Sequence, residues 1–254
     1  MPKKREEPGG PGPERPGGAG EIAGMPRASE ASGVEASPAA TVVLVRDGET
    51  GLEVLLTRRS SKLAFHGGAW VFPGGRIDPD DYAGAPEDVF AAARRAAARE
   101  AKEEAGLDVH AESLIHFSNW TTPEISPKRF ATWFFVGEAA GGEAVADGTE
   151  TDRLHWFRPE AAFAARDSGD IELAPPQYVT LLWLRDHTTV AEALRAAEEG
   201  EAIDYTPRFH FIEGGGAVCV YREDIAYDDR GRLDAAGPRH RLYLRDTGWE
   251  YLRD

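Results

Sequence analysis

REAKEEAG, residues 99–106, closes an alanine-rich segment and holds three glutamates within five positions. Glu100, Glu103 and Glu104 are three and four residues apart, so a helix would place their carboxylates on one face. Like charges at this spacing destabilise a helix by about 0.2–0.5 kcal/mol per pair. A hard divalent cation would relieve that repulsion, because such ions prefer oxygen ligands. A solvated acidic face is the alternative, and the neighbouring sequence must decide between the two.

The alanine-rich segment has the signals of a helix that ends at Ala105. Gly106 follows it and is typical of a helix C-cap. Pro86 suits the first helical turn, where Glu87 and Asp88 would face the positive end of the helix dipole. Alanine has a high helix propensity and a small side chain, so this helix could lie close against a sheet.

A glycine-rich turn precedes this helix. AWVFPGG, residues 69–75, is a short apolar strand stopped by Pro73 and followed by two glycines. Residues 76–85 then form an acidic, loop-like stretch with Asp78, Asp80 and Asp81. A carboxylate cluster beside a Gly-Gly turn could hold a metal ion and leave room for a phosphate.

Taken together, GGR and REAKEEAGL resemble the Nudix box, G-x5-E-x7-R-E-U-x-E-E-x-G-U, where U is apolar. The second half of the pattern is complete from Arg99 to Leu107. The resemblance implies an α+β fold, the Nudix-type α/β/α sandwich with a mixed sheet, here with a C-terminal helical and strand extension. It also implies a diphosphatase, in which water attacks one phosphorus of a substituted diphosphate.

The resemblance assigns a role to each residue of the box. Arg99 would orient the acidic cluster through charge-assisted hydrogen bonds. Gly74 and Gly75 would let the backbone approach the ligand closely. Glu150 matches a further glutamate that the family often takes from a distant loop, since it precedes TDRLHWFRPEAA. The ligands of Mg²⁺ or Mn²⁺ would be Glu100, Glu103 and Glu104.

The first half of the box is interrupted. An uninterrupted box has fourteen residues from glycine to arginine, whereas Arg99 follows Gly75 by twenty-four, which adds about ten residues to the loop. The acid expected eight residues before Arg99, which braces the arginine in the family, is Ala91. The acids that could replace it are Glu87, Asp88, Asp78, Asp80 and Asp81.

Residues 55–75, LLTRRSSKLAFHGGAWVFPGG, resemble the signature L-L-T-x-R-S-x-x-L-R-x-H-x-G of coenzyme A diphosphatases. The second arginine of that signature is Ala64 here. This branch implies hydrolysis of coenzyme A or acyl-coenzyme A to 3′,5′-ADP and (acyl-)4′-phosphopantetheine. The matching residues are Leu55, Leu56, Thr57, Arg59, Ser60, Leu63, His66 and Gly68.

Recognition of such a substrate needs fixed cations, and the candidates are Arg58, Arg59, Lys62, Lys128 and Arg129. Each is equally compatible with an ordinary surface charge. Two other functions stay open at this point. One is hydrolysis of another nucleoside diphosphate conjugate, such as ADP-ribose or NADH. The other is a Nudix-fold sensor or interaction module without turnover, although such a protein need not keep the glutamates.

The composition excludes several other classes. A net charge of −15 and the lack of a basic stripe argue against a nucleic-acid partner. No apolar run approaches the ~18 residues that span a membrane, and the N-terminus lacks an apolar signal region. Cys219 is the single cysteine, which excludes an intramolecular disulfide. We expect a cytoplasmic protein with a small-molecule substrate, and a homodimer is left open.

The chain divides into a tail and one domain. Residues 1–39 are rich in Gly and Pro and are expected to be disordered. Residues 40–254 form the Nudix domain, with the extension at about 186–254. Two helices are predicted over 176–199, with a break near 186–188. The expected strands are 41–45, 52–59, 69–73, 113–120, 129–139, one beginning at 154, and 209–214, 217–223 and 239–246.

Overall fold

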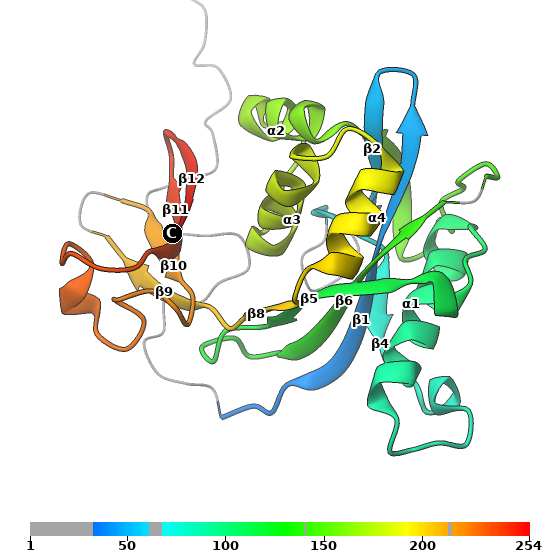
Figure 1. Cartoon of the computed structure of the whole chain (residues 1–254), viewed down its shortest axis with the longest axis horizontal. Helices are drawn as coiled ribbons and strands as arrows, with labels where there is room; N and C mark the ends of the chain where they lie inside the picture. The colour runs from blue at the N-terminus through cyan, green and yellow to red at the C-terminus, as the bar shows by residue number, and fades with distance from the viewer. Residues whose placement is uncertain (1–32, 61–67, 140, 213–214) are drawn as a thin grey trace, which may run out of the picture.

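A mixed eight-stranded sheet lies at the centre of the protein (Figure 1). The structure is a computed structural model that describes residues 33–60, 68–139, 141–212 and 215–254. The strand order is β3-β2-β1-β6-β5-β8, with β4 paired to β1 and β7 paired to β2. The strands are β1 Ser37–Gly48, β2 Gly51–Arg59, β3 Trp70–Val71, β4 Gly74–Arg76, β5 Ile115–Thr121, β6 Phe130–Glu138, β7 Thr151–Phe157 and β8 Ile203–Tyr205.

Pairing in this sheet mixes both directions. β1 and β2 form an antiparallel hairpin whose turn lies between Gly48 and Gly51, as the sequence predicts. β1 pairs with β6 in parallel, from Ser37 beside Phe130 onward. Every residue of β1 from Ala39 to Val45 is buried. A strand buried on both faces requires a covering layer on each side.

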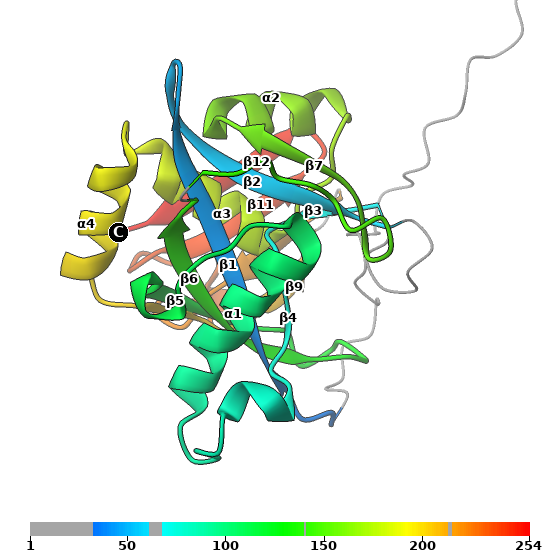
Figure 2. The same cartoon turned by 90° about the vertical axis from the view of Figure 1, so that its right-hand side faces the viewer.

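Helices supply those two layers (Figure 2). Helix α1 covers one face, whereas α2, α3 and α4 cover the other. The alternation along β1 follows this division, since Val42 packs toward α1 and Val43 toward the other helices. The expected α/β/α sandwich of the α+β class is therefore confirmed. The helices are α1 Val89–Ala105, α2 Pro159–Ser168, α3 Pro175–Arg185 and α4 Val190–Glu199, with short 3₁₀ helices at Pro79–Tyr82, Ala111–Ser113 and Arg230–Arg232.

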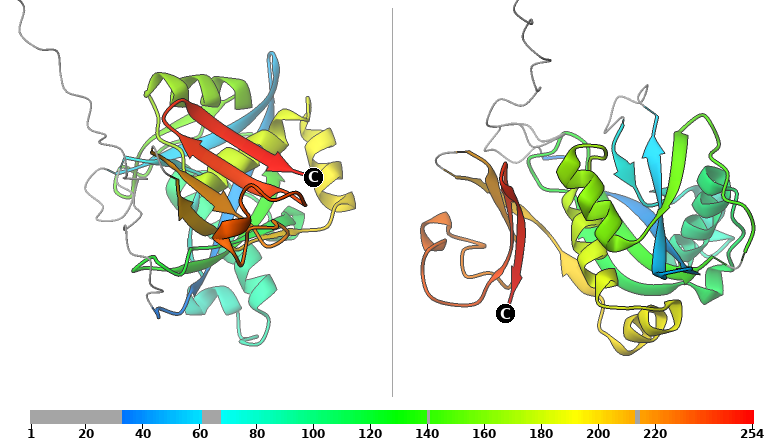
Figure 3. Two further views of the ribbon diagram at one scale, coloured as in Figure 1. Left: turned by 90° about the vertical axis from the view of Figure 1, so that its left-hand side faces the viewer. Right: turned by 90° about the horizontal axis from the view of Figure 1, so that it is seen from above.

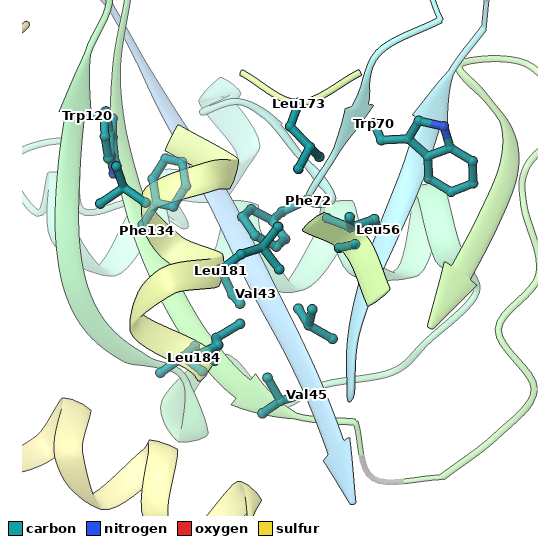
Figure 4. Packing of buried hydrophobic residues seen from close by; sticks show 14 of the residues in the cluster. Val43, Val45, Leu56, Trp70, Phe72, Trp120, Phe134, Leu173, Leu181 and Leu184 are labelled. Atoms are coloured by element: carbon teal, nitrogen blue, oxygen red, sulfur yellow. The ribbon is translucent and has the colours of Figure 1, made fainter. Parts of the chain in front are cut away.

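The larger core lies between the sheet and α3 (Figure 4). Leu181 and Leu184 of α3 are fully buried beside Val43 and Val45 of β1. Each such leucine contributes about 1.5–3 kcal/mol by leaving water. This packing fixes the position of α3, whose N-terminal end lines the cavity described below.

The ends of α1 follow their local sequence with one exception. Gly106 caps the C-terminus at a φ of 70°, as predicted. Pro86 was expected in the first helical turn, but the helix begins at Val89. Asp88 is the N-cap, and its carboxylate accepts a hydrogen bond of 2.9 Å from the amide of Ala91. A capping aspartate is a stronger start signal than a proline, because it satisfies an otherwise unpaired amide.

A second, antiparallel sheet forms most of the C-terminal extension (Figure 3). It lies on the side of the molecule that carries α3, away from α1 (Figure 1). Cys219 and Leu242 contribute to the same core as α3. The sequence did not predict β8, which has three residues, or the last strand, which has six. The strands of this sheet are β9 Arg208–Phe211, β10 Ala217–Val220, β11 His240–Arg245 and β12 Gly248–Arg253.

The expected tail, residues 1–39, overlaps the first residues of β1. Residues 37–39 belong to the strand, and Ser37 donates a hydrogen bond of 3.0 Å from its amide to the carbonyl of Arg129. Residues 1–32 lie outside the described part of the chain. Among the residues that the structure describes, no helix is both long and apolar enough to span a bilayer.

Candidate active site

The glutamates of α1 lie where this helix packs against strand β4. Glu100 and Glu104 are buried, whereas the side chain of Glu103 is 58% exposed. The amide of Gly74 donates a hydrogen bond of 3.2 Å to Oε2 of Glu104. A Cβ at Gly75 would collide with the carboxylate of Glu100. The Gly-Gly turn is therefore needed for β4 to pass this close to α1.

Arg99 connects the glutamates to the loop before the helix. Its Nη1 donates to Glu100 Oε1 at 2.9 Å and to Glu103 Oε2 at 2.8 Å. Its Nη2 donates to the carbonyl oxygen of Arg76 at 3.0 Å. These bonds hold the two carboxylates on the same side of the helix, which is the orienting role expected for Arg99.

Asp81 braces this arginine. Its carboxylate accepts hydrogen bonds from Nε of Arg99 at 3.2 Å and from Nη2 at 3.0 Å. Asp81 is only 6% exposed, and the amide of Asp78 donates to it at 2.8 Å. The acid missing at Ala91 is thus supplied by the 3₁₀ helix in the extended loop. Among the replacements open at the sequence level, Asp88 serves instead as the helix cap.

Glu150 faces the same cluster from a different part of the fold. It lies in the turn before β7, where its carbonyl accepts a 2.7 Å bond from the amide of Ser60. Asp147 shapes this turn by accepting from the amides of Glu150 at 3.0 Å and Thr151 at 2.7 Å. The negative charge of Glu150 acts on both Glu100 and Glu104. The structure therefore brings the distant acid expected from the sequence to the box glutamates.

Burial and neighbouring charges shift the pKa values of this cluster. Burial is the main cause that raises the pKa of Glu104 to about 8, and the charge of Glu100 adds to it. Burial also raises the pKa of Glu100, although the neighbouring Arg99 opposes that shift. The pKa of Arg99 is raised, chiefly by its hydrogen bond to Asp81. Ionising both glutamates at once is therefore unfavourable in the absence of a bound cation.

These groups line a cavity of about 880 Å³. Arg59 and Lys128, two of the expected substrate-binding cations, line it as well. The positive charge of Arg59 lowers the pKa of Glu104. The ammonium of Lys128 lies 5.2 Å from the centroid of the Phe130 ring. Both cations are therefore on the wall that a bound anion would meet.

The structure does not bring Arg129 to this wall. Its Nε donates to the carbonyl of Thr122 at 3.1 Å, and its Nη1 donates to the carbonyl of Val34 at 2.8 Å. Arg129 is absent from the cavity lining. Its donors instead connect the segment before β1 to the loop before β6.

The sequence analysis missed much of the rest of the cavity. Beyond the acidic wall, formed by Glu100, Glu104 and Glu150, the lining includes apolar side chains such as Phe72 and two prolines at the start of α3. Gln177 of α3 and Phe209 of the C-terminal sheet also line it. No local motif marks these residues, because the fold brings them together from distant segments.

The donor chemistry of the acidic wall fits a hard divalent cation. Among the described residues, no three His, Cys, Asp or Glu side chains form a complete metal-binding group on their own. Mg²⁺ commonly takes one or two protein carboxylates and completes its shell with waters and substrate phosphates. Two buried carboxylates that repel each other beside a large cavity, Glu100 and Glu104, meet that requirement.

Comparisons with known proteins agree with this geometry. Over 90 residues the chain is 34% identical to a putative 8-oxo-dGTP diphosphatase of Bacillus subtilis, covering 35% of this chain and 50% of that protein. Over 71 residues it is 42% identical to Nudix hydrolase 15, mitochondrial, of Arabidopsis thaliana, covering 28% of this chain and 22% of that protein. The chain thus spans half or less of the length of these curated relatives.

A solved structure shows the same fold. The crystal structure of a NUDIX hydrolase from Alicyclobacillus acidocaldarius superposes with a TM-score of 0.58 at 24% identity, covering 64% of this chain and 97% of that one. The NUDIX domain profile matches residues 36–178, which is more than half of the chain. On the sandwich fold, the complete second half of the box and this match, the chain belongs to the Nudix family.

Proposed function

We propose that the protein hydrolyses the diphosphate bond of a nucleoside diphosphate-linked small molecule with the help of Mg²⁺ or Mn²⁺. The observation that carries this proposal is the acidic wall, where Glu100, Glu104 and Glu150 act on one another beside a cavity of about 880 Å³. A protein that only binds a ligand has no need to bury mutually repelling carboxylates. This argues against a sensor without turnover.

The metal would be held by Glu100 and Glu104, with Glu103 available at the rim. When bound, it would neutralise charge on the diphosphate oxygens and lower the pKa of an attacking water. Arg99 keeps the glutamates oriented through the hydrogen bonds described above. The backbone of Gly74 and Gly75 leaves space for the phosphates next to the carboxylates.

Arg59 would bind a substrate phosphate. It lines the cavity, its charge reaches Glu104, and its Nε is buried with no hydrogen-bond partner among the described residues. A buried guanidinium nitrogen without a partner is a ready donor for a phosphate oxygen. Glu150, on the opposing turn, would accept a proton from the attacking water or ligate the metal.

For the substrate we propose coenzyme A or acyl-coenzyme A, cleaved to 3′,5′-ADP and (acyl-)4′-phosphopantetheine. The support is the match of residues 55–75 to the signature of coenzyme A diphosphatases. Residues 61–67 of that stretch, which include His66, lie outside the described part of the chain. The apolar and aromatic part of the cavity offers surface for a long substrate arm.

A substrate panel tests both levels of the proposal. Coenzyme A, dephospho-coenzyme A, ADP-ribose, NADH and 8-oxo-dGTP are compared at equal metal concentration, the last because of the name of the Bacillus subtilis relative. We expect the highest kcat/KM with coenzyme A or an acyl ester and no turnover in EDTA. If ADP-ribose is preferred, the coenzyme A proposal fails while the general one stands. Full turnover in EDTA would contradict the metal role.

A further inference from the structure

The cavity extends beyond the region shared with the family. The NUDIX profile ends at residue 178, yet Pro207 and Phe209, which precede and open the C-terminal sheet, line the cavity that holds the acidic wall. The C-terminal extension therefore contributes residues to the cavity wall. A wall element outside the shared fold is a natural place for substrate selectivity.

Trp120 connects the extension to this wall. Its ring stacks on Tyr205 with centroids 4.0 Å apart and an interplanar angle of 8°. Tyr205 in turn contacts the rings of Tyr221 and His240 of the extension at 5.1 and 5.5 Å. Trp120 is thus fixed by aromatic packing on the side of the C-terminal sheet, while it also lines the cavity.

Besides Arg59, two further cavity-lining side chains have a buried polar atom without a partner among the described residues. Nε1 of Trp120, which can only donate, has no acceptor among the described residues. Oε1 of Gln177, which can only accept, has no donor there. The two residues are 5% and 7% exposed. Buried polar atoms are nearly always paired, so an unpaired donor and acceptor lining one cavity point to a ligand that supplies both partners.

We propose that Trp120, Gln177 and Phe209 form a subsite for a planar group that carries both an N–H donor and a hydrogen-bond acceptor, at the end of the substrate away from the diphosphate. A nucleobase and the amides of a pantetheine arm share this chemistry. Phe209 supplies an apolar surface for the planar group, and Trp120 and Gln177 supply the polar partners. The use of this subsite in a reaction rests on the proposed function. Binding of a ligand to it can be measured without any hydrolysis.

The binding test uses two probes without phosphate, which need no metal: adenosine and pantetheine. Ligand-observed NMR titration of the full chain should show binding of one of them. Trp120→Phe and Gln177→Met each remove one polar partner and keep a similar shape, so each should weaken binding by about 3- to 10-fold. Phe209→Ala should weaken it as well, with Phe209→Leu in reserve if the alanine variant fails to fold. Adenosine binding assigns the subsite to the nucleobase, and pantetheine binding assigns it to the amide arm.

Phe211→Ala is the matched control. Phe211 lies two residues further along the same strand but does not line this cavity. It should leave binding unchanged. The inference is overturned if neither probe binds, or if the subsite variants bind as the unaltered chain does.

Kinetics separates this inference from the proposed function. On coenzyme A the three subsite variants should raise KM with little change in kcat, because they remove binding remote from the reacting phosphorus. A chain that binds a probe but hydrolyses no diphosphate would end the proposed function and leave the subsite in place. A chain that hydrolyses coenzyme A with unchanged KM in every variant would end the subsite alone.

Discussion

Arg99 donates to two glutamates on its own helix and to Asp81 on the extended loop. Asp81→Asn keeps the size of the brace and removes its charge, so the guanidinium loses its strongest partner. We expect kcat to fall by about 10- to 100-fold, the usual effect of losing a residue that orients metal ligands, with a smaller change in KM. Asp80→Asn, in the same 3₁₀ helix but exposed, should match the unaltered enzyme. If both variants are equally active, Asp81 is not the residue that holds Arg99 in place.

Arg59 and Arg58 are adjacent in β2 and offer a paired comparison. Arg58 is bound to Asp152 at 2.6 and 2.8 Å, whereas Arg59 lines the cavity. A charge-assisted bond to phosphate is worth about 1.5–3 kcal/mol, so Arg59→Ala should lower kcat/KM by about 10- to 100-fold. If Arg59 binds the 3′-phosphate, the loss will appear with coenzyme A and not with dephospho-coenzyme A. A similar loss in Arg58→Ala would show that the strand, not the cation, is responsible.

The raised pKa of Glu104 has a consequence for stability. Its pKa is about 8 in the folded chain against an ordinary value of 4.5, so the folded state holds the proton over a range where the unfolded state has lost it. Between these values, stability in the absence of metal should fall as pH rises, by up to about 1.4 kcal/mol per pH unit. Glu104→Gln should flatten this dependence in denaturant titrations with EDTA. An unchanged slope would contradict the raised pKa of buried Glu104.

At the scale of elements, the C-terminal sheet depends on one buried ion pair. Arg241 of β11 binds the carboxylate of Asp224 at 2.7 and 2.6 Å, and both side chains are fully buried. Removing one partner leaves the other charge buried and unpaired, so Asp224→Asn should cost about 3–5 kcal/mol. Glu250→Gln breaks an exposed pair with Arg245 in the same sheet and should cost less than about 1 kcal/mol. Denaturant unfolding measures both, and equal costs would refute the special role of the buried pair.

At the scale of the whole molecule, the start of β1 sets how much of the N-terminus can be removed. Residues 33–254 contain every described element, so we expect removal of residues 1–32 to leave folding and activity unchanged. Removal through Ala40 takes away strand residues that pair with both β6 and β4, and it should lower Tm by several degrees. Thermal unfolding of the two truncated chains decides this. A longer truncation with unchanged Tm would show that these pairings add no stability.

Local patterns explain which parts of the molecule could be predicted. The hairpin turn and the Gly106 cap depend on a few neighbouring residues, and the spacing of the glutamates fixes their common helix face. The sequence limits the acid that could brace Arg99 in place of residue 91 to a few candidates. It does not identify Asp81 among them, because the path of the extended loop decides which acid reaches Arg99. The position of Arg129 away from the cavity wall could not be predicted for a related reason: its charge is visible in the sequence, whereas the carbonyl groups that hold it are not. Phe209 reaches the cavity only through the placement of the second sheet.

The parallel pairing of β1 with β6 also sets an order in which the chain can fold. Ser37 lies beside Phe130, so the centre of the main sheet cannot form until the chain has been synthesised through β6, which ends at Glu138. The β11–β12 hairpin, in contrast, pairs residues that are close in sequence, from Arg245 beside Gly248 outward. Contacts this distant in sequence slow folding, because a long loop must close before any pairing is gained. Until then β1 has an unpaired edge and two apolar faces, which makes it the segment most exposed to aggregation while the chain is being made.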